Sequence, residues 1–398
     1  MCEKDPSAAG IRGMAALQSE RPAGEFSGKR LEQIAAGGVY NDVRTTIYFG
    51  AASQEERPVP PTLKDIAAHC GTSVSTVSHV LNEREGTFIG EATRARVLRA
   101  TRELGYRPNQ LARGLRSRRS MTVGVLMADL GYETHVRKLS AVLKAGAYLG
   151  FATAVSLARG GREAAREAIG RFLAARVEGV IVGSFSFAID AGDLEEAKAL
   201  GVPVVAIDPP DGGVPAVRVD RVEAGRLAAA HLLELGRRRL VFVGGAPDSY
   251  HIEAERHAGF RKAHDEKGMA CPDDKFVRWS FESPREVAER LLSRADKPDG
   301  VVALSDEVAF ALLQAFSDLG VRVPDDIAVV GYNDIRLARH AVPPLTTVAQ
   351  PDTEVGEAAV RILGEAIDSH RDGADEGEPE EVVLVPKLVV RSSCGGGS

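Results

Sequence analysis

The alternation of apolar, strand-like runs with amphipathic segments across residues 121–398 constrains the fold most strongly. The strand-like runs are Thr122–Met127, Phe151–Leu157, Gly179–Val182, Val202–Ile207, Leu240–Val243, Phe276–Trp279, Gly300–Leu304, Asp326–Val330 and Val382–Leu388. Helix-like segments such as Val222–Leu235 and Val308–Leu319 lie between them. This order predicts parallel sheets covered on both faces by helices, and nine strands favour two lobes over one. A small-molecule site is then expected in a cleft between the lobes, outside the carboxyl ends of strands.

The composition excludes several classes of protein. The chain has 398 residues, 44% hydrophobic and 27% charged, as in an ordinary soluble globular protein. No run of about 20 apolar residues occurs, so no membrane span is expected, and Met1–Glu20 lacks the apolar region of a secretory signal. The cysteines lie far apart without a Cys-x-x-Cys motif, which argues against disulfide, zinc and iron–sulfur sites. We expect a cytoplasmic protein without a metal, a cofactor or a membrane partner.

Charge is distributed unevenly along the chain. The net charge is −6, but residues 62–120 carry eleven Lys or Arg against five Asp or Glu. That segment is therefore at +6, which leaves −12 on the other residues. A small basic module joined to a large acidic body favours an anionic polymer bound at one end of the chain. A solvated charged surface is the alternative interpretation.

Residues 62–107 are predicted to form three short helices. Thr62 and Asp65 have the spacing of a capping box, Gly71 is placed to end the first helix, and Ser73 is a good N-cap for the second. The third is expected over Glu91–Leu104. Its inward side chains are predicted to be Val97, Leu98, Thr101 and Leu104, and its mostly outward ones Arg94, Arg96, Arg99 and Arg102.

The first two of these helices, joined by a short turn with a glycine, predict a helix-turn-helix unit. In such a unit the second helix enters the major groove of DNA and reads base edges with its N-terminal residues. Small polar side chains let the backbone approach the groove, and Ser73, Ser75, Thr76 and Ser78 meet that need. The alternative is a generic three-helix core whose Ser and Thr side chains only face water.

The segments on either side of this module are predicted to lack a stable fold of their own. Residues 1–60 are expected to be a disordered extension, either a functional arm or the product of a mis-assigned start codon. Residues 108–120 are a basic linker in which Leu111, Ala112 and Leu115 share one helical face. A helix this short, weakened by Gly114, needs DNA or a twin in a dimer to become ordered. The predicted organisation is an extension (1–60), a helix-turn-helix domain (61–107), a hinge (108–120), a two-lobed core (121–393) and a tail (394–398).

An ordered set of motifs runs from residue 62 to residue 393. In the basic module these are Thr62–Ala67, Val77–Asn82 and Gly105–Asn109. In the body they are Val123–Val125, Gly179–Val182, Val202–Val205, Arg256–Phe260, Pro324–Tyr332, Pro343–Val348 and Val389–Ser393. Taken together, they resemble the lactose/galactose-repressor (LacI/GalR) family of bacterial transcription regulators.

This resemblance implies a homodimeric, sequence-specific transcription regulator, most simply a repressor. It would combine a small all-α helix-turn-helix domain with an α/β core of two lobes like the periplasmic binding proteins. Each dimer would place two recognition helices in successive major grooves of a near-palindromic, double-stranded operator. Residues Asn109–Arg116 would fold into a hinge helix on DNA, with Leu115 inserted into the minor groove.

The resemblance also assigns DNA contacts. The residues expected to set base preference are Val74, Ser75, Thr76 and His79, although His79 could instead be a partly buried surface histidine. Those expected to hold phosphates, which position the protein without specifying sequence, are Thr62, Ser73 and Asn82. The other predicted DNA contacts are Leu63, Ser78, Tyr106, Asn109, Ala112, Leu115 and Arg116.

The expected effector site lies in the core, and a sugar or sugar derivative is one class of effector that it would take. Arg256 resembles the family's pocket arginine, which would hold a ligand hydroxyl or carboxylate; a structural ion pair is the alternative. Asn333 stands where many sugar-binding relatives carry Asp. Trp279 or Phe281 is expected to stack on the ligand, unless either is simply core. The other expected contacts are Tyr132, Ser305 and Asp306.

Two other functions fit the sequence less well. A periplasmic solute-binding protein would have a similar core, but it predicts a signal peptide and no helix-turn-helix. An enzyme is disfavoured because no nucleophile elbow, Walker loop or dinucleotide-binding fingerprint occurs. The sequence therefore favours a regulator whose affinity for its operator is controlled by a small molecule bound between the lobes.

Overall fold

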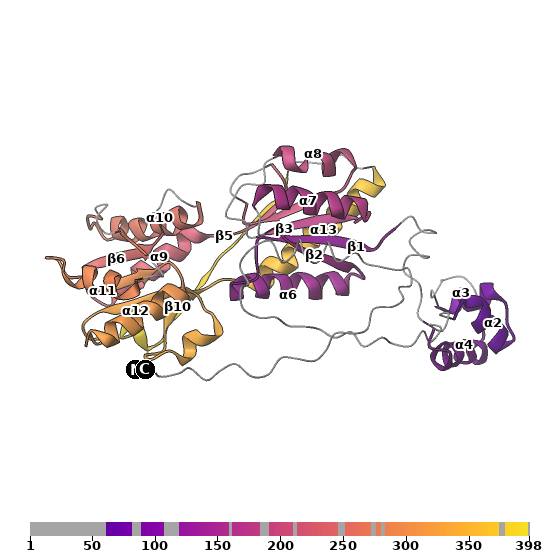
Figure 1. Cartoon of the computed structure of the whole chain (residues 1–398), viewed down its shortest axis with the longest axis horizontal. Coiled ribbons are helices and arrows are strands. Elements are labelled where there is room, and N and C mark those ends of the chain that lie inside the picture. Colours follow the sequence, from indigo (N-terminus) through magenta and orange to yellow (C-terminus); the bar gives the residue numbers. More distant parts are fainter. Residues whose placement is uncertain are drawn as a thin grey trace, which may run out of the picture. The chain divides into compact units, whose positions relative to one another are not determined.

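The computed structural model describes residues 61–81, 89–106, 119–158, 161–183, 191–209, 213–245, 251–271, 276–279, 283–373 and 379–396. The chain divides into two units, residues 1–107 and residues 108–398 (Figure 1). The predicted extension and nearly all of the predicted hinge lie outside the described residues.

The described residues of the first unit form three helices around a small core. They are α2 (Leu63–Cys70), α3 (Val74–Leu81) and α4 (Glu91–Glu103), which confirms the three predicted helices. The carboxylate of Asp65 accepts a hydrogen bond from the backbone N–H of Thr62 (2.6 Å), as the predicted capping box requires, and a further one from the Thr62 hydroxyl (2.7 Å). Gly71 ends α2 with a φ of 63°, a left-handed conformation that glycine adopts without strain.

The inward face of α4 differs from the prediction at one position. Val97 and Ala100 are buried against α2 and α3, whereas Leu98 is 40% exposed. At 100° per residue, a helix cannot turn both Val97 and its neighbour Leu98 fully into one small core. The smaller Ala100, three residues after Val97, takes the inward position instead. The four arginines are exposed as predicted.

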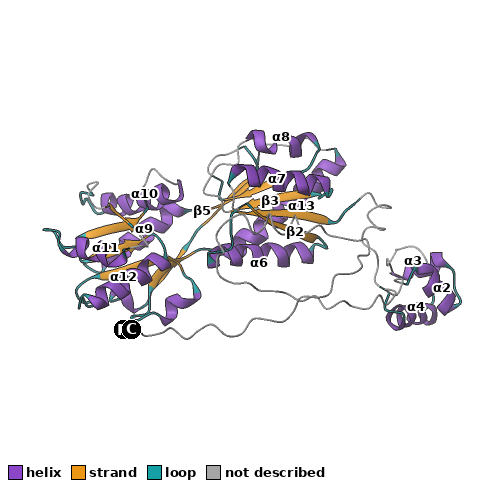
Figure 2. Cartoon of the chain, viewed as in Figure 1, coloured by secondary structure: helices purple, strands orange, loops and turns teal. Residues whose placement is uncertain are grey.

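In the second unit, the described strands form two sheets of six strands each (Figure 2). The first sheet has the order β11-β5-β4-β3-β1-β2 and is parallel throughout; its strands are β1 (Thr122–Met127), β2 (Ala152–Leu157), β3 (Gly179–Gly183), β4 (Val204–Ile207), β5 (Ala216–Val219) and β11 (Glu381–Leu384). The second has the order β12-β10-β9-β8-β6-β7; its strands are β6 (Leu240–Gly244), β7 (Phe276–Arg278), β8 (Gly300–Ala303), β9 (Ala328–Asn333), β10 (Thr346–Ala349) and β12 (Lys387–Val389). Only β12 runs antiparallel to its neighbour within these described sheets.

Helices cover both faces of each sheet, as the alternation predicted. The helices of the first lobe are α6 (Glu133–Tyr148), α7 (Arg162–Ala174), α8 (Ala191–Ala199) and α13 (Asp352–Asp372). Those of the second lobe are α9 (Arg221–Glu234), α10 (His251–Glu266), α11 (Pro284–Leu292), α12 (Asp306–Asp318) and the short 3₁₀ helices η2 (Arg336–His340) and η3 (Ser392–Cys394). One apolar core lies between the first sheet and α6 with α13, and another lies between that sheet and α7 with α8. In the second lobe, α9 and α10 cover one face of the sheet, and α11 and α12 cover the other.

The chain passes between the lobes at three described places. It leaves the first lobe after β5 for α9, returns after β10 for α13, and crosses again between β11 and β12 (Figure 1). These crossings bring residues that are far apart in sequence together at the junction of the lobes.

Three strand predictions need correction. The single run predicted over Val382–Leu388 is two strands in different sheets, because Pro386 has no N–H for a ladder and interrupts pairing. The strands β5 and β10 were not predicted, because Arg218 in β5 and Thr346 and Thr347 in β10 interrupt the apolar pattern. The strand predicted over Asp326–Val330 instead runs over Ala328–Asn333, so Asn333 is its last residue.

The predicted tail also begins later than expected. Cys394 is 1% exposed within the second lobe, where its Sγ lies 3.2 Å from Nε2 of His231 and 3.1 Å from the hydroxyl of Thr346. Burial opposes thiolate formation, but hydrogen bonds from His231 and Thr346 lower the pKa of this thiol to about 7. None of the helices that the structure describes is long and apolar enough to cross a membrane.

Candidate functional site

The N-terminal turn of α3 presents small side chains on an open surface of the first unit. Ser73 caps the helix, because its hydroxyl accepts a hydrogen bond from the backbone N–H of Thr76 (3.0 Å) and lies 2.8 Å from the Thr76 hydroxyl. Ser73, Val74 and Ser75 are exposed, while Val77 is fully buried on the opposite face. The cap thus starts the helix, and Ser73, Val74 and Ser75 stay exposed within the part of the chain that the structure describes.

The other predicted DNA contacts in the module are placed less uniformly. Thr76, Ser78 and His79 are half-buried beside this face. Thr62 is exposed at the start of α2, and its hydrogen bonds to the carboxylate lower the pKa of Asp65. Leu63 and Tyr106 are half-buried against the three-helix core, so packing already accounts for part of each side chain. The predicted contacts outside the described residues are Asn82, Asn109, Ala112, Leu115 and Arg116.

In the second lobe, close helix packing positions Arg256. A Cβ at Gly259 of α10 would overlap the carbonyl oxygen of Val222, and one at Gly225 of α9 would overlap the carbonyl oxygen of Arg256. The two glycines therefore let the two helix backbones touch. This contact holds α10 against α9 and directs Arg256 toward the carboxyl ends of β8 and β9.

The guanidinium of Arg256 is oriented by two groups. Its Nη1 donates a hydrogen bond to the carbonyl of Leu304 (2.7 Å), and its central carbon lies 3.6 Å from the centroid of the Tyr332 ring. Arg256 is 9% exposed, and the structural ion pair considered for it is not seen among the described residues. Its Nε has no hydrogen-bond partner in the described structure. The side chain is thus fixed, with donor capacity remaining.

Asp306 and Ser305, at the start of α12, are engaged within the protein. Asp306 is fully buried and accepts hydrogen bonds from the hydroxyl of Thr347 (2.5 Å) and the backbone N–H of Ile335 (2.9 Å). Burial raises the pKa of this carboxyl to about 6. Ser305 caps α12 through the N–H of Val308 (3.4 Å). Asp306 thus holds the ends of β9 and β10 together, whereas Ser305 starts α12, and the carboxylate of Asp306 already accepts two hydrogen bonds.

The remaining predicted effector contacts lie in different surroundings. Asn333 is buried, and its side-chain oxygen accepts a hydrogen bond from Gln350 (2.7 Å) at the second crossing. Trp279 is half-buried against the core beneath α11 and α12, which favours the core interpretation for it. Tyr132 precedes α6 in the first lobe, is 47% exposed, and its ring packs edge-on to His135. Phe281 lies outside the described residues.

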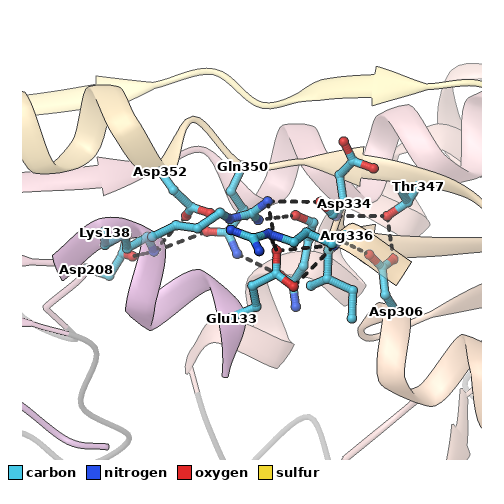
Figure 3. A network of polar contacts seen from close by, with 12 residues as sticks. Glu133, Lys138, Asp208, Asp306, Asp334, Arg336, Thr347, Gln350 and Asp352 are labelled. Carbon is cyan, nitrogen blue, oxygen red and sulfur yellow. Dashed lines mark hydrogen bonds and ion pairs between the residues drawn. The ribbon is translucent and has the colours of Figure 1, made fainter. Parts of the chain in front are cut away.

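Sequence reasoning missed a buried cluster of charges at the junction of the lobes (Figure 3). Nζ of Lys138 lies 2.9 Å from Oδ2 of Asp208 and 3.8 Å from Oδ1 of Asp352. Nη2 of Arg221 lies 2.8 Å from Oδ1 of Asp208, and Nη2 of Arg137 lies 2.8 Å from Oδ2 of Asp352. Asp208 directly follows the apolar strand β4, and this position was the one sequence signal that could have found the cluster.

The two acids of this cluster respond differently to burial. Burial alone would raise the pKa of Asp208, but Arg221 and Lys138 together hold it well below its usual value. For Asp352 burial prevails over Lys138 and Arg137, and its pKa rises to about 6. Asp208 is therefore firmly ionised, whereas Asp352 is a carboxylate close to protonation.

The first turns of α10 were also missed. Glu255 lies 3.3 Å from Arg221, and burial together with Arg221 lowers the pKa of His251. Burial raises the pKa of Glu253, whose Oε2 lacks a hydrogen-bond partner among the described residues. In the described parts of the chain, no group of three or more His, Cys, Asp or Glu side chains could hold a metal ion.

Comparison with known proteins gives a consistent result. The family profile "Bacterial regulatory proteins, lacI family" matches residues 62–109, and the profile "Periplasmic binding protein-like domain" matches residues 229–394. The chain is 35% identical over 353 residues to the HTH-type transcriptional regulator CelR of Thermobifida fusca, covering 85% of this chain and 99% of that protein. It is 30% identical over 337 residues to the HTH-type transcriptional repressor PurR of Photobacterium profundum, covering 83% of this chain and 98% of that protein.

Solved structures resemble the chain over a similar length. A complex of the transcriptional regulator CelR with cellobiose aligns with a TM-score of 0.61 and 33% identity, covering 84% of this chain and 99% of that one. The lac repressor dimer bound to operator and the anti-inducer ONPF aligns with a TM-score of 0.71 and 28% identity, with the same coverage.

Proposed function

The chain belongs to the LacI family of bacterial regulatory proteins, and on this premise we propose that it is a transcription regulator whose affinity for operator DNA is set by a small molecule bound at the junction of its lobes. It acts by binding, not by catalysing a reaction. The protein works as a homodimer on a near-palindromic operator, and repression is the simplest mode of action.

The observation that carries this proposal is the exposed, capped N-terminal turn of α3. Its outer face carries Ser73, Val74 and Ser75, all of them small. A helix with such a face approaches base edges closely, and the major groove offers a distinct pattern of donors and acceptors for each base pair. Val74 offers an apolar contact for a thymine methyl, and Ser75 offers a hydroxyl that donates or accepts. The hydroxyl of Ser73 lies at a helix start, where phosphates are favoured; the hydroxyl of Thr62 donates to Asp65 here and turns from it to reach a phosphate.

The effector in this proposal is a sugar or sugar derivative. A relative of known structure holds cellobiose, and the lac repressor holds the anti-inducer ONPF. In this chain, Arg256 supplies an oriented donor, and Glu253 supplies a carboxylate oxygen without a donor. Both are on α10 and suit a ligand rich in hydroxyl groups. Asp306 and Asn333, in contrast, support the strand ends that frame the site.

Selection from random duplex DNA tests the DNA-binding part of the proposal. The full chain is expected to enrich a near-palindromic sequence with two half-sites about one helical turn apart. Substituting Ser75→Ala is expected to change which bases are enriched, whereas Thr62→Val is expected to weaken binding to all sequences alike. If no sequence is enriched, or if both variants change affinity uniformly, the assignment of α3 as the reading helix is wrong.

A thermal-shift screen of the full chain against sugars, sugar acids, nucleobases and nucleosides tests the effector part. A ligand at 100 times its Kd raises apparent stability by about 2.7 kcal/mol. The hit is expected to change the Kd for the selected operator, and Arg256→Gln is expected to abolish the shift. A ligand that stabilises the protein without changing operator affinity would refute the proposed control.

A further inference from the structure

Arg137 of α6 reaches from the first lobe to the end of β9 in the second. Its Nη2 donates to the carbonyl of Asn333 (2.6 Å), and its Nη1 donates to the carbonyl of Asp334 (2.9 Å). The same Nη2 lies 2.8 Å from the carboxylate of Asp352. One half-buried guanidinium therefore clamps two successive backbone carbonyls across the junction.

The clamped backbone is unusual. Asn333 has a φ of 119° and Asp334 a φ of 47°, so two successive residues with side chains have positive φ. Such conformations are disfavoured for L-residues and persist where surrounding contacts impose them. This two-residue segment is thus held away from its relaxed conformation.

Contacts to the segment come from both lobes. The side chain of Asn333 accepts from Gln350 at the second crossing (2.7 Å), and the carboxylate of Asp334 pairs with Arg391 (2.7 Å). The N–H of Asp334 points to the hydroxyl of Thr347 (3.4 Å). Among the described contacts to these two residues, those of Arg137 alone come from the first lobe, so a relative movement of the lobes would break them first.

The neighbouring residues extend the same link. The N–H of Ile335 donates to the buried Asp306, and the N–H of Arg336 lies 3.2 Å from both carboxylate oxygens of Glu133, one turn before Arg137 on α6. The first lobe, to which α6 belongs, begins with β1, which follows directly on the segment that leads from the DNA module. The state of residues 333–336 is therefore tied to the lobe that carries that module.

We infer that Arg137 is a positioning residue that couples the two lobes, and that it acts by holding the strained backbone of Asn333 and Asp334 rather than by touching the effector. This inference rests on the proposed function for its consequence at the operator. While the clamp is closed, the lobes keep the angle seen here. When the clamp opens, the segment relaxes and the lobes lose this link, while the pair between Arg221 and Asp208 and the three chain crossings still join them. An effector that favours one of these states changes operator affinity through Arg137.

Hydrogen exchange of the full chain, followed by mass spectrometry, tests the clamp without ligand or DNA. Arg137→Lys keeps the charge near Asp352 but cannot donate to both carbonyls in the planar geometry of arginine. We expect about tenfold or faster exchange in peptides covering 333–337, with β8 unchanged. Asp352→Asn keeps the carbonyl clamp and is expected to stay within about twofold of the wild type. Arg285→Gln, which changes an exposed ion pair on α11, is the matched control.

Three outcomes would overturn the inference. Unchanged exchange at 333–337 in Arg137→Lys would show that no clamp exists. An equal acceleration in Asp352→Asn would assign the effect to the ion pair. Acceleration throughout the second lobe would indicate general destabilisation.

Operator binding then tests the coupling. Arg137→Lys is expected to change the Kd for the selected operator by about fivefold or more, and to make it insensitive to the wild-type effector, with cellobiose as the first probe. Calorimetry is expected to show that a sugar bound by the wild type is still bound by the variant. A wild-type Kd and a full effector response in Arg137→Lys would refute the coupling role, as would complete loss of sugar binding. If the wild type selects no DNA, the proposed function fails, while the exchange result still decides whether the clamp exists.

Discussion

Replacing Lys138 by methionine is the sharpest test of the buried charge cluster. The side chains of Lys138, Asp208 and Asp352 are 4%, 2% and 3% exposed. Methionine preserves an unbranched apolar stem of similar length but removes the ammonium group. Asp208 and Asp352 would then share two arginines in place of two arginines and a lysine. The substitution therefore removes a charge from a site that water hardly reaches.

The expected cost follows from what the two acids retain. Removing one partner of a buried ion pair typically costs about 3–5 kcal/mol, because the other charge remains buried without compensation. Asp208 keeps Arg221 at 2.8 Å and the N–H of Val219 at 3.0 Å, so the loss is expected at the lower end, about 3 kcal/mol. The lower end already allows for Asp352, whose pKa of about 6 lets it take up a proton once the ammonium group is gone. Even so, about 3 kcal/mol is a large share of the stability of a typical domain.

Urea unfolding of the full chain measures this loss with two probes. Far-ultraviolet circular dichroism reports both lobes, while the fluorescence of Trp279, the only tryptophan, reports the second lobe. If the cluster joins the lobes, both transitions are expected to move to lower urea together. A shift in circular dichroism alone would show that the lobes unfold separately.

The control is Arg285→Met on α11, whose arginine is 59% exposed. Its change is expected to stay within about 0.5 kcal/mol. A loss below about 1 kcal/mol for Lys138→Met would refute the argument, because the buried acids would then not depend on the ammonium group.

Three further predictions concern other parts of the molecule. Burial raises the pKa of Asp306 from 3.8 to about 6, so the folded chain keeps a proton that the unfolded chain loses, and the free energy of unfolding falls as pH rises from about 4 to about 6. Asp306→Asn is expected to reduce that fall by about 3 kcal/mol in denaturation measured at a series of pH values. An unchanged pH profile would contradict the raised pKa. Gly259→Ala is expected to push α10 from Val222, lowering Tm and weakening effector binding together; normal values of both would contradict the close packing. Ser73→Ala removes the hydroxyl that accepts from the N–H of Thr76, and it is expected to lower the free energy of unfolding by about 1 kcal/mol. It is also expected to weaken binding to every DNA sequence alike. A loss of affinity for the operator alone would assign Ser73 a base contact.

Local features of the fold could be predicted because neighbouring residues determine them. The cap between Thr62 and Asp65 needs a spacing of only three residues, and the apolar runs of the central strands are visible in the sequence. The errors arose where local signals were weak. Pro386 divides a continuous apolar run, and the apolar Leu98 lies on the outer side of α4 while the smaller Ala100 faces the core.

The candidate site was predicted in part, because the roles of its residues depend on distant partners. Asp306 and Asn333 were expected to face a ligand, but their hydrogen-bond partners lie between 17 and 41 residues away and meet them only in the folded lobe. Arg137 and Lys138 look like ordinary charged residues of a helix surface, and no local pattern shows that one face of α6 is buried at the junction. Arg256 could be placed because its motif includes Gly259, whose missing side chain allows the helix contact.

The last crossing between the lobes has a consequence for synthesis and truncation. The strands β11 and β12 are consecutive in the sequence but form the outer edges of different sheets. Both are synthesised only after nearly all of the chain has been translated. A ribosome must therefore release almost the entire polypeptide before either lobe is whole. A premature stop codon near residue 380 would remove an edge strand from both sheets at once, so even a short C-terminal truncation damages the whole core.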